Sequence, residues 1–174
     1  EKDLPVPIQR DLDPETITGS DRLLSALGAW VTLKQACIVI SAGTTVTIDF
    51  IDGEGTFHGG VIAPGTRIQL KSLFQDTHAL PEIKYEIPNQ TVFGKSTKES
   101  MLQGIHYGLI GLVQKTTENF SEIYGAYPML IATGGDANSL FGNEEIIDRI
   151  VPDLALIGIG HTAQKILFPN EENK

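Results

Sequence analysis

Residues 37–64 read CIVISAGTTVTIDFIDGEGTFHGGVIAP, and this stretch decides the fold. Residues 37–40 are a continuous apolar run, as expected of a strand that is buried on both faces. Over residues 45–50 polar and apolar side chains alternate, which is typical of a half-buried strand. Asp52-Gly53 then indicates a hairpin turn, and residues 56–63 are expected to form a third strand. The stretch therefore predicts an antiparallel meander of three strands.

Helices are predicted on both sides of this meander. Residues 1–18 hold three prolines and are expected to form a lead-in segment with little regular structure, after which Ser20 can N-cap a helix. A second helix is expected from about residue 64. Ser96 and Glu99 have the spacing of a capping box, which predicts the start of a third and longer helix. Three glycines on one face of that helix would permit close packing against a sheet or another helix: Gly104, Gly108 and Gly111.

The C-terminal third is predicted to alternate strands with helices. The apolar runs at residues 129–132 and 154–157 are expected to be strands, with helices over 143–149 and 161–168. The polar tail, residues 169–174, is expected to be flexible. A three-strand meander followed by such an alternation is the order of the ribonuclease-H-like module of actin-like ATPases. We therefore predict an α/β fold whose mixed five-stranded sheet is flanked by helices.

Composition indicates a folded protein and argues against two classes of partner. The 174 residues are 41% hydrophobic and carry a net charge of -9, which suits one ordinary domain over residues 19–168. Such acidity argues against binding nucleic acid. No apolar run approaches the roughly 20 residues of a membrane span, and no signal peptide is visible. Cys37 is the single cysteine, so no intrachain disulfide can form. We expect a cytoplasmic protein that binds neither nucleic acid nor membrane.

Several familiar motifs are near misses. Residues 94–96 read GKS, like the end of a P-loop, but Asn89 stands where the first glycine is required. Residues 158–160 read GIG, as in a dinucleotide fingerprint, but no strand with a ribose-binding acid follows. The four histidines lack metal-ligand spacing, and no Gly-x-Ser-x-Gly elbow occurs. We reject these interpretations.

Three glycine-bearing loops, each at a strand end, are better candidates for a ligand site. They lie at residues 43–45, 59–65 and 134–135. Each alone is more often just a turn, but together they suggest a cleft lined by backbone N–H groups. Asp21, at the start of a helix, leaves two interpretations open. It is either a carboxylate favoured by the helix dipole or a general base.

Taken in order, these motifs resemble those of the type III pantothenate kinases. The resemblance covers residues 5–168 and rests on five stretches: GSDR at 19–22, SAGTTVTID at 41–49, GGVIAPG at 59–65, the stretch from Leu80-Pro81 through Gly94, Ser96 and Thr97 to Gly104, and TGGDA at 133–137. The resemblance implies ATP-dependent phosphorylation of the primary hydroxyl of pantothenate, the first step toward coenzyme A. It also implies a homodimer with sites near the interface, and a monovalent cation, K⁺ or NH₄⁺.

The resemblance also assigns roles to individual residues. Asp21 stands at the position of the proton acceptor. The implied pantothenate-binding residues are Gly19, Ser20, Asp21, Arg22 and Thr97. The implied ATP-binding residues are Thr44, Gly134 and Gly135.

Two departures from the family pattern affect these expectations. The family's N-terminal domain, with its Asp-x-Gly-Asn-Ser/Thr phosphate loop, is absent from this sequence, so we expect negligible turnover by this chain alone. Ser41 replaces the cation-binding aspartate, and a neutral hydroxyl is a weaker ligand for a hard cation. One alternative is therefore a non-catalytic binding or regulatory relative, of the transcriptional accessory factor type. Another is a sugar or acetate kinase of the same superfamily.

Overall fold

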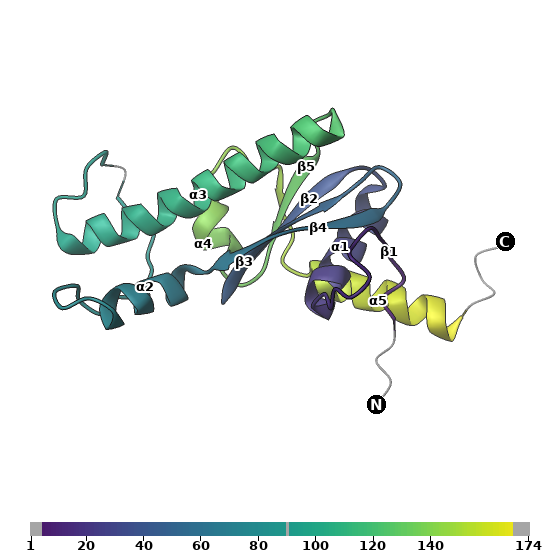
Figure 1. Ribbon diagram of the computed structural model, residues 1–174, viewed down its shortest axis with the longest axis horizontal. Helices are drawn as coiled ribbons and strands as arrows, with labels where there is room; N and C mark the ends of the chain where they lie inside the picture. The colour runs from purple at the N-terminus through teal and green to yellow at the C-terminus, as the bar shows by residue number, and fades with distance from the viewer. Residues whose placement is uncertain (1–4, 90, 169–174) are drawn as a thin grey trace.

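A single mixed sheet forms the centre of the molecule (Figure 1). The computed structural model describes residues 5–89 and 91–168. Within them the strand order is β1-β4-β3-β2-β5-β6. The strands are β1 (Gln9–Arg10), β2 (Cys37–Ala42), β3 (Thr45–Ile51), β4 (Thr56–Pro64), β5 (Met129–Thr133) and β6 (Arg149–Ile150). Strands β2, β3 and β4 are antiparallel, as the alternation predicted, while β5 runs parallel to β2.

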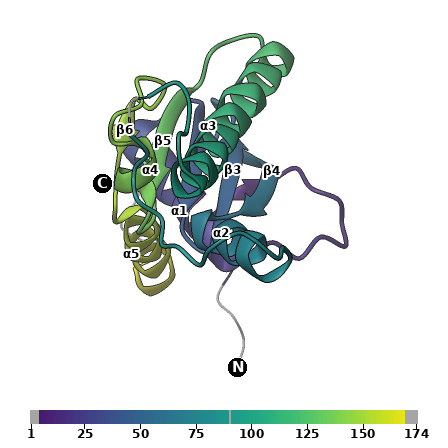
Figure 2. The same ribbon diagram turned by 90° about the vertical axis from the view of Figure 1, so that its left-hand side faces the viewer.

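Helices cover both faces of the sheet. They are α1 (Ser20–Leu33), α2 (Thr66–Gln75), α3 (Thr97–Tyr124), α4 (Ala137–Phe141) and α5 (Leu154–Leu167). Figure 2 looks onto α2 and α3 with the strands behind them, whereas α1 and α5 lie on the other side. A hydrophobic core lies on each face of the sheet, and side chains of β3 contribute to both. Val46 and Ile48 pack toward α3, whereas Ile51 packs toward α1 on the other face. The α/β class and the actin-like arrangement are thus confirmed, with six strands instead of five.

The interpretation of residues 154–157 as a strand was wrong. They begin α5, whose buried positions Leu154, Gly158 and Thr162 recur every four residues. A short apolar run cannot be assigned to strand or helix by hydrophobicity alone. The helix predicted over 143–149 was also wrong, because its last residue starts the two-residue strand β6.

At the start of the chain only the N-cap of α1 differs from expectation. The segment before α1 has little regular structure, as predicted, but within residues 5–18 the two-residue strand β1 pairs in parallel with β4 and Val6 is buried. Gly19, not Ser20, is the N-cap of α1, so Ser20 is the first helical residue. The predicted flexible tail, residues 169–174, lies outside the described residues.

Two glycines let α1 and α5 pack closely. A Cβ on Gly28 would collide with the carbonyl oxygen of Leu154, and a Cβ on Gly158 would collide with that of Leu24. Gly158 is the first glycine of the GIG motif. Its contact with Leu24 gives this glycine a role in helix packing, in agreement with the rejection of the motif as a dinucleotide site. Backbones can approach this closely only where no side chain intervenes.

The capping box at the start of α3 is confirmed. Ser96 Oγ accepts from the Glu99 N–H at 3.2 Å, and the Glu99 carboxylate accepts from the Lys95 N–H at 3.0 Å. The helix runs for 28 residues, and in Figure 1 its N-terminal half and α2 extend beyond the strands. Its glycine face does not pack against any described residue, because none lies within 4 Å of a Cβ built on Gly104, Gly108 or Gly111. Across residues 5–89 and 91–168, no helix combines the length and the apolar character that a membrane crossing needs.

Candidate active site at the sheet edge

The glycine-bearing loops meet at one edge of the sheet. The Asp136 N–H donates to the Ala42 carbonyl at 3.1 Å, and the Gly65 N–H donates to the Thr44 carbonyl at 3.0 Å. Gly134 has a φ of +95° and lies against the Ala42 carbonyl, where a Cβ would collide. Three loops far apart in sequence therefore line the carboxyl ends of β2 and β5, which is where open α/β sheets bind ligands.

A cavity of about 670 Å³ opens beside these loops. Thr44 and Asp136 lie on its wall together with residues of α2 and of the segment that follows α2. Arg67 Nη2 donates to Thr44 Oγ1 at 3.1 Å. Thr44 and Gly134, which the sequence predicts to bind ATP, are therefore brought together at this edge, and Gly135 is exposed beside them.

Asp21 and Arg22 point to different environments. Asp21 is exposed in the first turn of α1, as a proton acceptor needs to be. Arg22 instead reaches across to Asp49 in β3, with Nε 3.1 Å from Oδ2 and Nη2 in closer contact with Oδ1. Burial raises the pKa of the Asp49 carboxyl, and the hydrogen bonds from Arg22 oppose that rise. The hydrogen bond to Asp49 raises the pKa of Arg22. The pair fixes the start of α1 to the sheet.

Sequence reasoning missed the role of Asp49. A carboxylate on a strand between buried neighbours was the available signal, since buried charges are almost always paired. Nothing local indicates that the partner lies 27 residues earlier.

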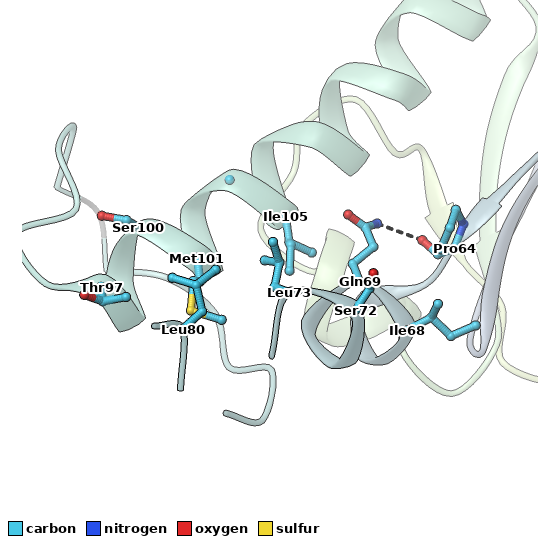
Figure 3. Close-up of a pocket in the computed structure, with 11 residues that line it drawn as sticks. Pro64, Ile68, Gln69, Ser72, Leu73, Leu80, Thr97, Ser100, Met101 and Ile105 are labelled. Carbon is cyan, nitrogen blue, oxygen red and sulfur yellow. Dashed lines mark hydrogen bonds between the residues drawn. The ribbon is translucent and has the colours of Figure 1, made fainter. Parts of the chain in front are cut away.

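Thr97 lies away from the other residues that the sequence predicts to bind pantothenate. It is the first residue of α3, on the opposite face of the sheet from α1. Figure 3 shows it with Ser100 at one end of a groove between α2 and α3, which has a volume of about 660 Å³. Apolar side chains line most of this groove: Ile68, Leu73, Leu80, Met101 and Ile105. The structure does not bring Thr97 and Asp21 together within one chain.

The residues around Ser41 do not fit a cation held by a carboxylate. Ser41 pairs in register with Thr47 on β3 and Thr133 on β5, so its nearest cross-strand neighbours are also hydroxyls. Asp49 lies further along β3, and its carboxylate forms an ion pair with Arg22. In the part of the chain that the structure describes, no group of three or more His, Cys, Asp or Glu side chains could hold a metal.

A polar network beside the cavity, centred on one buried histidine, was also missed. His106, which the sequence left as a scattered histidine, is buried between Tyr85 and Glu144. A carboxylate can only accept, so His106 Nε2–H donates to Glu144 at 3.2 Å and Nδ1 accepts from the Tyr85 hydroxyl at 2.9 Å. Burial raises the pKa of Tyr85 to about 12. These hydrogen bonds fix the position of Tyr85, which lines the cavity.

The mixed sheet with helices on both faces forms an α/β domain of the actin-like fold, and solved structures share this fold. A protein from Campylobacter jejuni named as a Baf family transcriptional activator is 19% identical, with a TM-score of 0.67 over 89% of this chain and 68% of that one. A Sinorhizobium meliloti protein named as a 2-dehydro-3-deoxygalactonokinase is 15% identical, with a TM-score of 0.58 over 83% of this chain and 59% of that one.

Sequence comparison identifies the family. The type III pantothenate kinase family matches residues 1–119, so the chain belongs to that family. Type III pantothenate kinases of Zymomonas mobilis and Rhodospirillum rubrum are each 39% identical, over 85% and 81% of this chain and 54% of each relative. That of Akkermansia muciniphila is 40% identical over 81% of this chain and 58% of the relative. The chain spans about half the length of these curated relatives.

Proposed function

We propose that this chain forms one half of a kinase that transfers the γ-phosphoryl group of ATP to the primary hydroxyl of pantothenate. The observation that carries this proposal is the meeting of the glycine-bearing loops at the sheet edge, with Thr44 on the wall of a cavity. Exposed loop backbone there can approach a nucleotide closely. The relatives named as type III pantothenate kinases suggest pantothenate as the acceptor.

Asp21 serves as the general base in this proposal. The pantothenate hydroxyl oxygen attacks the γ-phosphorus, the bond from phosphorus to the β–γ bridging oxygen breaks, and ADP leaves. Asp21 takes the hydroxyl proton. Arg22 keeps Asp21 in place through its ion pair with Asp49, while Gly19 and Ser20 contact pantothenate. Thr44, Gly134 and Gly135 contact ATP.

We further propose that the working enzyme is a cytoplasmic homodimer. Thr97 and Asp21 lie on opposite faces of the sheet, so a site that uses both must combine two copies of the chain. The open glycine face of α3 supports this, because it offers close approach to another chain. Turnover also requires the phosphate loop of the family's other domain, so this chain alone is expected to give negligible activity.

A second candidate is a binding or regulatory relative without turnover. The hydroxyl surroundings of Ser41 favour it, because they lack the family's anionic cation ligand. This candidate predicts that the intact protein binds ATP or pantothenate but releases no ADP.

Replacement of Asp21 by Asn in the intact protein tests the base assignment. Removing the carboxylate is expected to lower kcat by about 10²–10⁴-fold. Asp13→Asn provides the matched control, because Asp13 is also exposed and lies outside the helix start. ADP release and thermal melting are measured for both variants. A near-normal kcat in Asp21→Asn, with an unchanged melting temperature, would refute the assignment of Asp21 as the general base.

A further inference from the structure

We propose that Arg67, Lys71 and Lys84 bind the phosphate chain of the nucleotide, and that Arg67 also orients the Thr44 hydroxyl toward it. This inference rests on the proposed use of ATP and names residues that neither the motifs nor the family match assign. It concerns the 670 Å³ cavity at the sheet edge.

The three cations reach this cavity from two segments. Arg67 and Lys71 are four residues apart on α2, so they lie on the same side of the helix. Lys84 comes from the segment after α2, and all three line the cavity. Over residues 5–89 and 91–168 none of the three forms a salt bridge, whereas Lys98 and Lys115 pair with Glu86 and Glu118. Three unpaired cations on one wall, in a chain of net charge -9, make a local anion site.

The start of α2 adds to this positive wall. The helix has 10 residues, and its N-cap, Gly65, offers no side-chain acceptor to the first turn. Thr66 and Arg67, in that turn, line the same cavity. Unsatisfied N–H groups and the helix dipole both favour a phosphate at such a position.

Arg67 has a second role through Thr44. A threonine hydroxyl has one proton to donate and can accept at its lone pairs. Because Thr44 Oγ1 accepts from Arg67 Nη2 at 3.1 Å, its proton stays available to a phosphate oxygen. Arg67 is therefore a positioning residue for Thr44 as well as a charge.

The acids of the cavity favour a nucleotide over free polyphosphate. Glu82 and Asp136 also line it, so three cations face two carboxylates. Carboxylates repel phosphate but accept hydrogen bonds from ribose hydroxyls, as the acidic residue of a dinucleotide site does. The cavity thus suits a ligand with a phosphate end and a hydroxyl end.

Calorimetric titration of this 174-residue chain with ATP, inorganic tripolyphosphate and adenosine tests the charge assignment. Lys71→Gln/Lys84→Gln is expected to weaken ATP and tripolyphosphate binding about tenfold, as the loss of two exposed charge contacts predicts. Adenosine binding should not change. The matched control is Lys34→Gln/Lys115→Gln, which removes the same charge from exposed positions outside the cavity. Equal losses in both double variants, no loss in either, or no binding of ATP and tripolyphosphate by the unmodified chain would each overturn the proposal.

A double-mutant cycle tests the positioning role. Arg67→Lys keeps a charge but loses the guanidinium hydrogen bond, and Thr44→Val removes the hydroxyl. If Arg67 acts through Thr44, Arg67→Lys weakens tripolyphosphate binding in the unmodified chain and has little further effect in Thr44→Val. Additive losses would contradict that role.

These titrations separate the inference from the proposed function. Tripolyphosphate binding requires no pantothenate and no turnover. Loss of binding in Lys71→Gln/Lys84→Gln supports the inference even if the intact protein proves not to phosphorylate pantothenate. Conversely, normal pantothenate phosphorylation with unchanged binding in that variant would refute the inference alone.

Discussion

The ion pair between Arg22 and Asp49 offers a demanding test of how α1 is held to the sheet. The Arg22 side chain is 15% exposed and that of Asp49 is 2% exposed, so both charges are largely removed from water. Replacing Arg22 by Leu leaves the Asp49 carboxylate buried without its partner. Breaking such a pair on one side costs about 3–5 kcal/mol of unfolding free energy. Shifts of about 2–4 °C per kcal/mol then predict a melting temperature lower by about 10 °C.

The pH dependence of this loss has a defined sign. Burial raises the pKa of Asp49, and Arg22 is what opposes the rise, so Arg22→Leu must raise this pKa further. A folded-state pKa above the unfolded value means that the folded state binds more protons, so stability falls as pH rises between the two values. The variant should therefore be much less stable than the unmodified chain at pH 7.5, and the difference should shrink at pH 5.

Urea unfolding followed by circular dichroism at pH 5 and pH 7.5 measures both effects. Arg22→Leu/Asp49→Leu is the control, because replacing both partners by apolar residues is often neutral or stabilising. It should recover most of the lost stability. A loss below about 1 kcal/mol in Arg22→Leu, where one-sided removal of a buried partner costs several, would refute the reasoning. So would an equal loss at both pH values.

Two further predictions concern the packing of α1 against α5 and the hydrogen bonds of His106. Gly158→Ala should lower the unfolding free energy by about 1–3 kcal/mol, because the new Cβ meets the Leu24 carbonyl. Gly160→Ala, on the same helix but with nothing within 4 Å, should raise it by up to about 1 kcal/mol, and equal urea midpoints for the two variants would contradict the packing role. Tyr85→Phe should cost about 1–3 kcal/mol in thermal unfolding, because it leaves His106 Nδ1 buried without a donor. An unchanged melting temperature would contradict the assigned hydrogen bond.

Local patterns in the sequence predicted much of the fold. Alternation in residues 45–50 identified β3, and the Ser96/Glu99 spacing located the start of α3, because both signals depend on neighbours in sequence. Strands β1 and β6 are only two residues long, which is too short for any periodicity to register. The run at 154–157 was assigned as a strand because apolar content alone does not distinguish a strand from a helix.

The candidate site was predictable only in part, for a related reason. The loops around Thr44 and Gly134 could be expected to meet, because both follow strands that end at one sheet edge. The separation of Thr97 from Asp21 depends on which face each helix covers, and that follows from tertiary topology. The unpaired cations Lys71 and Lys84 carry no motif, and only the cavity brings them together.

We propose above that these residues form half of a pantothenate kinase. The most direct test is pantothenate-dependent ADP release by the intact gene product, with this 174-residue chain assayed in parallel, in potassium and in ammonium buffers. Release by the intact protein and not by the chain is the predicted result. No release by either, in both buffers, would contradict the kinase assignment and favour a binding or regulatory relative.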